Sequence, residues 1–140
     1  QAHYLEAITV NQQPAYQTRQ PIRGYSLFVS QLNPQFTESQ RVAQSLGKQL
    51  YQLKRPPTLH HAEAIEGENR PLLHKKYGVY RYDQLAVLRQ TTIPAVLLEI
   101  GVIVDKQDEA YVSQAANRQA MIQAIVRALQ KYQKVSPRTD

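Results

Sequence analysis

The sequence predicts an α/β domain in which helices cover a largely parallel β-sheet. Strand-like and helix-like segments alternate along the chain, which is the pattern of that class. Residues 94–101 form a nearly continuous apolar run, as is typical of a strand buried on both faces of a parallel sheet. The 140 residues, of which 42% are hydrophobic, are enough for one domain with a single core.

The first half of the chain contributes one strand and one helix. Residues 1–24 show no sustained periodicity, which predicts an extended or loop segment. Tyr25–Ser30 is rich in aromatic and branched residues and predicts a strand. A helix is expected to begin at Thr37 and to end before Pro56, because proline lacks the N–H that a helix needs. The apolar face of this helix consists of Val42, Leu46, Leu50 and Leu53.

The second half contains shorter elements. We expect short strands at 58–62 and 85–88, with a polar, loop-like stretch at 63–82 between them. The acidic segment 105–109 suits a helix N-terminus, which carries a positive partial charge. A last helix is expected over 115–132. Its predicted buried stripe consists of Ala120, Ile122, Ile125, Val126 and Leu129.

These elements predict one α/β core at 25–133, preceded by the segment 1–24 and followed by a tail at 134–140. The apolar strand around Val96 needs strand neighbours on both sides, and four candidate strands barely supply them. We therefore expect further strands of the domain to lie outside this chain.

The chain carries a net charge of +6 and contains no cysteine. The charge favours anionic partners such as nucleic acid, anionic lipid or acidic cell-wall polymers. The basic residues are scattered, however, so a solvated surface is the preferred interpretation and no nucleic-acid partner is expected. The absence of cysteine excludes disulfides and thiolate metal sites. No apolar run approaches the roughly 20 residues of a membrane span, and the first residues lack the pattern of a secretory signal.

Several motifs together resemble a known enzyme family. In Ile93–Asp105 a proline precedes an apolar run, a glutamate and a glycine, and acidic residues follow. This segment resembles the late strand of the zinc-dependent N-acetylmuramoyl-L-alanine amidases of bacterial cell-wall turnover. Gly24–Pro34, His60–Glu63, Gly67–Arg70 and the Gly-Val-Tyr-Arg-Tyr-Asp run at 78–83 resemble a branch of that family with a long insertion. The resemblance covers most of the chain.

The resemblance implies that this chain is the C-terminal portion of an amidase-like α/β domain, without the N-terminal strands and helix. The family binds one Zn²⁺ through two histidines and a glutamate, and none of their motifs is present here. We therefore expect the Zn²⁺ ligands outside this chain and assign no metal ligand within it. Gln1–Arg23 would belong to the insertion. The family's catalytic glutamate matches Glu99.

Glu99 is also the best candidate base on sequence grounds alone. A glutamate within an apolar strand costs free energy and requires a reason, and α/β sheets place their sites at the C-terminal ends of strands. In the implied reaction, zinc lowers the pKa of its bound water to about 7. Glu99 takes the proton from this water and passes it to the leaving amine. The alternative is a buried carboxylate paired with Arg or Lys.

Two neighbouring histidines allow a separate metal hypothesis. Adjacent residues of a strand point to opposite faces, so His61 and Glu63 would share a face and supply two of the three ligands that zinc requires. His3 and His74 are distant in sequence and lie in loops. We prefer a role for His61 in packing or hydrogen bonding beside the substrate cleft.

Glu68, Asn69 and Arg70 suit recognition of a peptide stem, because arginine pairs bidentately with carboxylates. A loop held by its own hydrogen bonds is an equal alternative. Three tyrosines, Tyr77, Tyr80 and Tyr82, are expected to pack within the loop in preference to lining a groove.

These inferences predict a peptidoglycan hydrolase that cleaves the amide between N-acetylmuramic acid and the L-alanine of the stem peptide. It would act in the periplasm or elsewhere outside the cytoplasm, with muropeptides and a missing N-terminal segment as its partners. The alternative is a metal-free, amidase-like module that only binds peptidoglycan or a partner protein. A third hypothesis, an anion- or nucleic-acid-binding domain, rests on charge alone.

Overall fold

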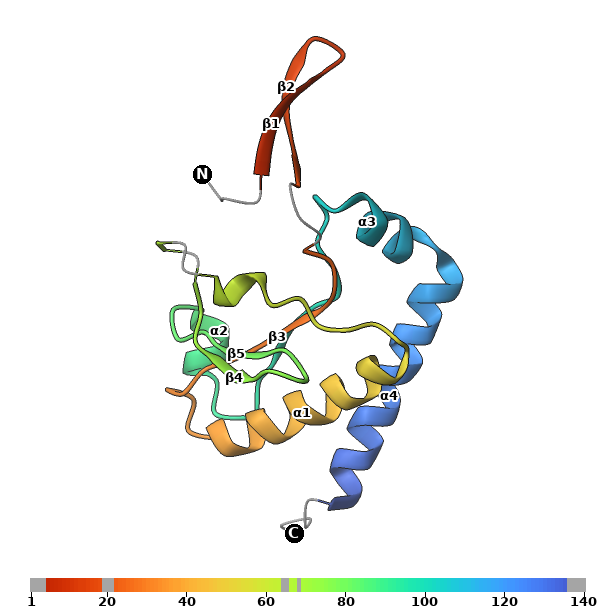
Figure 1. The fold of residues 1–140 in the computed structure, drawn as a ribbon. Coiled ribbons are helices and arrows are strands. Elements are labelled where there is room, and N and C mark those ends of the chain that lie inside the picture. The colour runs from red at the N-terminus through yellow and green to blue at the C-terminus, as the bar shows by residue number, and fades with distance from the viewer. Residues whose placement is uncertain (1–4, 19–21, 64–65, 68, 136–140) are drawn as a thin grey trace.

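The computed structural model describes residues 5–18, 22–63, 66–67 and 69–135. They form a mixed four-stranded sheet with helices on its two faces, and a β-hairpin precedes the sheet (Figure 1). The α/β class predicted from the sequence is confirmed. None of the described helices combines the length and apolar character needed to cross a membrane.

The sheet has the strand order β4-β5-β3-β6. Its two central strands, β3 (Ser26–Val29) and β5 (Val79–Arg81), run parallel. β4 (Leu72–His74) is antiparallel to β5, and β6 (Leu97–Glu99) is antiparallel to β3. The predicted parallel character therefore holds for one pairing of three. β4 and β5 are joined by a short turn, and a connection of that length allows only an antiparallel pair.

β6 lies at the edge of the described sheet, where β3 is its one described partner. Leu97 and Leu98 are half-buried, and the Glu99 side chain is 46% exposed. Leu98 packs against one hydrophobic cluster and Leu97 against the cluster on the opposite face of the sheet, so both faces of β6 contact core residues. The predicted burial is therefore only partial, and the predicted parallel pairing is wrong for this strand, because β6 is an antiparallel strand at the edge of the described sheet.

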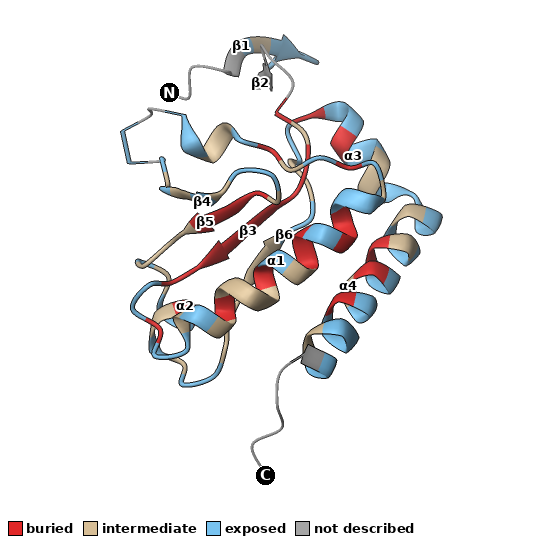
Figure 2. Ribbon diagram, turned by 60° about the horizontal axis from the view of Figure 1, so that its bottom comes forward, coloured by how far each residue is buried: buried red, intermediate tan, exposed pale blue. Residues whose placement is uncertain are grey.

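Two helices cover one face of the sheet. α1 (Phe36–Gln52) and α4 (Ala115–Val135) pack against each other, with the main core between them and the sheet (Figure 2). On the opposite face, Phe28 and Tyr80 pack with Leu88 of α2 (Ala86–Gln90). The main core consists of Tyr25, Leu27, Val29, Ala43, Leu46, Leu50, Val79, Met121, Ala124 and Ala128.

The buried stripe of α4 differs from the predicted one. Met121, Ala124 and Ala128 are the buried positions of this helix, and the two alanines let α1 approach closely. The predicted stripe lies roughly 100° further around the helix. Three of its members are largely exposed, at 52% for Ile122, 47% for Val126 and 43% for Leu129.

Three other segments differ from their predicted structure. Residues 58–62, predicted as a strand, contain the 3-10 helix η1 (His60–Ala62). The predicted strand at 85–88 falls in α2, and the predicted loop at 63–82 contains β4 and β5. Periodicity does not separate strand from helix in runs of three to five residues.

Residues 1–24 contain a β-hairpin of β1 (Leu5–Val10) and β2 (Gln13–Thr18). Asn11 and Gln12 form its two-residue turn with φ values of 49° and 63°. A turn of this kind requires positive φ at both positions, and asparagine tolerates it well. The acidic segment 105–109 forms the N-terminus of α3 (Lys106–Ser113), as predicted, with Asp105 as N-cap accepting hydrogen bonds from the amides of Gln107 and Asp108.

Candidate active site

Glu99 ends β6, and its carboxylate faces His61 of η1. The distance from His61 Nε2 to Glu99 Oε2 is 3.2 Å. Because an ionised carboxylate only accepts hydrogen bonds, Nε2 carries the hydrogen and donates it. The hydrogen bond from His61 lowers the pKa of Glu99, against the effect of partial burial, and electrostatic attraction to His61 and His60 lowers it further. Glu99 is therefore ionised at neutral pH.

Aromatic rings hold the imidazole of His61 in place. It meets Phe28 and Tyr80 edge to face, with ring centroids 5.0 Å and 5.5 Å away, and lies 3.9 Å from the ring of His60. Phe28 and Tyr80 are buried residues of the two central strands. The sheet thus positions the imidazole, and the expectation that His61 packs and hydrogen-bonds beside a cleft agrees with this geometry.

His60 is held on its other side by Thr58. Its Nδ1 lies 2.8 Å from Thr58 Oγ1. Burial lowers the pKa of His60 to about 4, the nearby His61 adds to this effect, and Glu99 opposes it. His60 is therefore neutral at pH 7. The Tyr80 hydroxyl donates to the carbonyl of Thr58 over 2.8 Å, and burial raises the pKa of this phenol, so it stays a donor.

A pocket of about 280 Å³ surrounds the Glu99–His61 pair. The Arg70 guanidinium enters it over the Tyr82 ring, 4.4 Å from the ring centroid. Arg70 Nη1 also donates to the carbonyls of Gly67 and Asn69, at 3.2 Å and 3.0 Å. Arg70 therefore brings positive charge to the pocket and ties down its own loop. The lining residues are Phe28, His60, His61, Gly67, Arg70, Tyr82 and Glu99.

The other predicted contact residues have different positions. Asn69 is exposed and is not part of the pocket lining, and Glu68 lies outside the described residues. Of the three tyrosines, Tyr82 lines the pocket, Tyr80 is buried beneath it, and Tyr77 lies elsewhere.

A buried ion pair fixes the turn that follows Glu99. Arg55 Nη1 lies 2.9 Å from Asp108 Oδ1, and Arg55 Nη2 donates to the carbonyl of Ile100 over 2.6 Å. Asp108 Oδ2 accepts from the amide of Val102 over 2.8 Å. The alternative role for Glu99 is that of a buried carboxylate paired with Arg or Lys. In the structure Asp108 is such a carboxylate, whereas Glu99 is partly exposed and pairs with His61.

The sequence gives no sign of the Arg55–Asp108 pair, but Gly101 is a weak signal of close packing at this turn. A Cβ at this position would lie 2.9 Å from Arg55 Nη2 and 3.2 Å from Asp108 Oδ2. Contacts this short leave room for glycine alone unless the pair moves.

The described part of the chain contains no cluster of three or more His, Asp or Glu side chains that could hold a metal ion. His61 is paired with Glu99, and Glu63 is exposed. His74 accepts a hydrogen bond from the amide of Tyr77, and His3 lies outside the described residues. A three-ligand zinc site does not fit the described residues.

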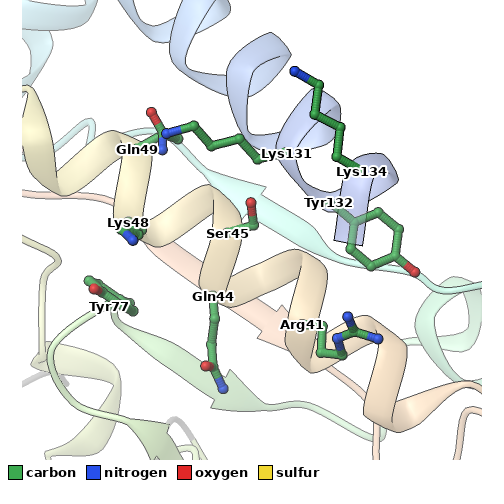
Figure 3. Close-up of a pocket in the computed structure, with 9 residues that line it drawn as sticks. All are labelled: Arg41, Gln44, Ser45, Lys48, Gln49, Tyr77, Lys131, Tyr132 and Lys134. Atoms are coloured by element: carbon green, nitrogen blue, oxygen red, sulfur yellow. The ribbon is translucent and has the colours of Figure 1, made fainter. Parts of the chain in front are cut away.

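A larger pocket, of about 610 Å³, lies between α1 and α4 (Figure 3). It is basic and shares no residue with the Glu99 pocket. No carboxylate lines it, so it offers no base for hydrolysis, and we place the candidate active site at Glu99. The larger pocket is lined by Arg41, Gln44, Ser45, Lys48, Gln49, Tyr77, Lys131, Tyr132 and Lys134.

Solved structures with a similar fold are amidases. Ami1 from Mycobacterium smegmatis superposes with a TM-score of 0.66 at 22% identity, over 86% of this chain and 52% of that one. The CwlD amidase from Clostridioides difficile, solved in complex with the GerS lipoprotein, has a TM-score of 0.59 at 18% identity, over 81% and 48%. The chain therefore spans about half the length of these solved proteins.

Sequence relatives carry related names. The protein named "Probable cell wall amidase LytH" from Staphylococcus epidermidis is 48% identical over 52 residues, which are 37% of this chain and 18% of that protein. Its namesake from Staphylococcus saprophyticus is 44% identical over the same length. A family model described as N-acetylmuramoyl-L-alanine amidase matches residues 11–131. Because this match covers most of the sequence, the chain belongs to the N-acetylmuramoyl-L-alanine amidase family.

Proposed function

We propose that this chain is the Glu99-bearing portion of a peptidoglycan hydrolase that cleaves the amide between N-acetylmuramic acid and L-alanine. The observation that supports it best is the ionised Glu99 carboxylate, which ends β6 inside a pocket and accepts a hydrogen bond from His61. Family membership supports the reaction class. Because peptidoglycan lies outside the cytoplasmic membrane, the enzyme would act there.

Amide hydrolysis needs a group that accepts a proton and later returns it. As the oxygen of water bonds to the amide carbonyl carbon, Glu99 accepts a proton from that water. When the carbon–nitrogen bond breaks, Glu99 gives the proton to the leaving nitrogen of L-alanine. His61 acts as a positioning residue, because its hydrogen bond to Oε2 orients the carboxylate and leaves Oε1 to take the proton.

Substrate contacts are proposed for the rim of the same pocket. Arg70 lines it and is charged, so it would attract the carboxylates of a stem peptide. Glu68 and Asn69 flank Arg70 in the sequence and stay proposed contacts on that ground.

Family membership also implies Zn²⁺, and the described residues do not form a site for it. We therefore assign the Zn²⁺ ligands to a polypeptide outside this chain and derive no step through the metal. The 140-residue chain alone is expected to bind no stoichiometric zinc.

The test compares this chain with an extended form, in which this chain is joined to a polypeptide that carries the family's zinc-ligand motifs. The extended form is expected to contain zinc and to release peptides from purified muropeptides. Glu99→Gln should lower kcat by about 10²–10⁴. Glu109→Gln, which changes an exposed carboxylate of α3, is the matched control and should leave kcat unchanged. Equal rates for wild type and Glu99→Gln would exclude Glu99 as the base.

A metal-free binding module is the second candidate, because the described residues lack a three-ligand set. Measurements on the same preparations distinguish the binding module from the hydrolase. Muropeptides that bind the extended form without zinc and without release of product would favour the binding module.

A further inference from the structure

The pocket between α1 and α4 is lined by three lysines that have no acidic partner among the described residues. Lys48 extends from α1, and Lys131 and Lys134 lie about one turn apart on α4 (Figure 3). No ion pair joins any of the three to a described carboxylate. Cations that meet in a concave site without neutralising partners concentrate positive potential there, and that potential attracts anions.

The arginine of this pocket is already engaged. Arg41 Nη1 lies 2.8 Å from Glu38 Oε1, and the Tyr132 hydroxyl donates to Glu38 Oε2 over 2.6 Å. Arginine has a planar fork that suits carboxylates, whereas lysine is a compact point charge with three donors that binds phosphate well. Because the positive charge that stays available comes from lysines, the pocket favours phosphate over carboxylate.

A buried amide adds a fixed hydrogen-bond donor to the lysines. Gln49 is 1% exposed and lines the pocket. Arg127 Nε donates to Gln49 Oε1 over 3.4 Å, so the amide hydrogens are on Nε2, and no described residue accepts them. In Figure 3 the Lys131 side chain extends from α4 toward this amide. A buried donor without an acceptor costs free energy, and an anionic oxygen bound beside Lys131 would supply the acceptor.

The two helices hold these donors around a space that is larger than one ion. Ser45 Oγ donates to the carbonyl of Ala128 over 2.8 Å and so ties α1 to α4 beside the pocket. The volume of about 610 Å³ is typical of sites for whole organic ligands. Lys76 continues the positive charge outside the pocket, because its ammonium lies 5.6 Å from the centroid of the Tyr77 ring, which lines the pocket. A ligand with several anionic groups therefore fits this surface better than a single ion.

We propose that this pocket binds the phosphate groups of a linear anionic polymer. Phosphate oxygens accept hydrogen bonds from Lys48, Lys131 and Gln49 Nε2, and a neighbouring phosphate of the same polymer meets Lys134. The pocket shares no residue with the Glu99 pocket, so a bound polymer would hold the protein in place and leave the Glu99 pocket open. Binding here does not depend on the hydrolysis proposed above.

Linear inorganic polyphosphate is the probe, and its affinity for the 140-residue chain is measured by calorimetry at several salt concentrations. Lys131→Gln removes one charge from the pocket. Lys106→Gln removes an exposed charge of α3, outside the pocket lining, and is the matched control. Gln49→Met replaces the amide by an apolar side chain of similar length. Circular dichroism compares the folding of each variant with that of wild type.

Lys131→Gln is expected to reduce the slope of the logarithm of affinity against the logarithm of salt concentration by about 1. Gln49→Met should weaken binding by about two- to tenfold, the effect of one neutral hydrogen bond, and should leave the slope unchanged because the amide carries no charge. Lys106→Gln should change the slope and the affinity much less. Equal effects of Lys131→Gln and Lys106→Gln would overturn the proposal, because binding would then follow net charge and not this pocket.

Competition between ligands tests the chemical class of the polymer. Polyphosphate should bind more tightly than orthophosphate, polyglutamate of equal length, a single-stranded DNA oligonucleotide or vesicles that contain an anionic phospholipid. A site that preferred polyglutamate would recognise carboxylates, and a site that preferred DNA or vesicles would serve nucleic acid or a membrane, so each of these results would overturn the proposal. Orthophosphate that bound as tightly as polyphosphate, or polyphosphate that failed to bind at low salt, would overturn it as well.

Discussion

Arg55 Nη1 lies 2.9 Å from Asp108 Oδ1, and the two side chains are 7% and 2% exposed. The pair joins the segment after α1 to α3 and bonds to the backbone on both sides of Gly101. Asp108 Oδ2 also accepts from the amide of Gly24, where the core begins. Loss of one partner would leave the other charge buried without a counter-ion, which costs far more than loss of an exposed pair.

Arg55→Met is therefore expected to lower the free energy of unfolding by about 3–5 kcal/mol, as measured by urea denaturation. The control is Arg41→Met, which removes the half-exposed pair of Arg41 with Glu38 at 2.8 Å. A pair at that exposure is worth about 0.5 kcal/mol or less. If the two variants lost equal stability, the buried pair would not be a main support of the turn after Glu99.

Gly24 is held in a conformation and a space that suit glycine. Its φ is 126°, and a Cβ there would lie 2.4 Å from the carbonyl oxygen of Pro56 and 2.6 Å from the amide nitrogen of Thr58. Gly67 also has positive φ, at 79°, but a Cβ there would meet no atom of the described residues within 4 Å. Alanine substitutions at the two positions therefore distinguish the cost of a positive φ from the cost of steric overlap.

Gly67→Ala is expected to cost about 1–2 kcal/mol, the penalty of a left-handed residue. Gly24→Ala should cost more, about 3 kcal/mol or above, because backbone atoms have to move. Thermal unfolding of both variants measures the difference. Equal losses would show that the segment at 56–58 shifts away from residue 24 at little cost.

The elements that the sequence predicts well are those with long periodic patterns or clear boundaries. α1 has a repeating apolar face and ends before Pro56, and α3 begins at its capping Asp105. β4 and β5 have three residues each, and Val79 and Tyr80 are buried because β5 pairs with β3. That pairing depends on contacts between segments that are distant in the sequence, and a local sequence pattern does not predict such contacts.

The residues of the candidate site also divide into those that a local sequence pattern indicates and those that only the folded chain brings together. The local sequence indicates Glu99, because a glutamate is unusual in an apolar strand, and the structure places it beside His61 in one pocket. Its catalytic role stays a prediction. The supports of this pair, Phe28, Tyr80 and His60, lie on three different elements and meet only in the folded chain. Nothing local distinguishes the stripe that α4 buries from the one it exposes, since both are apolar and the choice depends on where α1 packs.

His61→Ala should raise the pKa of Glu99, because the hydrogen bond from His61 is the main cause of its lowered value. A ¹³C NMR titration of the Glu99 carboxyl measures the change. A group with a lowered folded-state pKa stabilises the fold above its unfolded pKa and loses that contribution as pH falls through the folded pKa. Because the pKa of Glu99 is lowered less in the variant, the variant should lose less stability than wild type as the pH falls through the range in which Glu99 titrates. His74→Ala, distant from the pocket, is the control, and an unchanged Glu99 titration in His61→Ala would contradict the assigned hydrogen bond.

His60 should make the fold sensitive to mild acid. Burial, and then the nearby His61, lower its pKa from the ordinary value of 6.5 to about 4. Between these two values the unfolded chain binds a proton that the folded chain does not, so stability falls as pH drops from about 6.5 to about 4 and this group adds no further loss below that. His60→Asn keeps a polar side chain near Thr58 but removes the titration. The variant should therefore lose less stability than wild type between pH values of about 7 and 5, measured by urea denaturation at each pH. Parallel stability curves for the two proteins would show that His60 does not titrate differently in the folded and unfolded states.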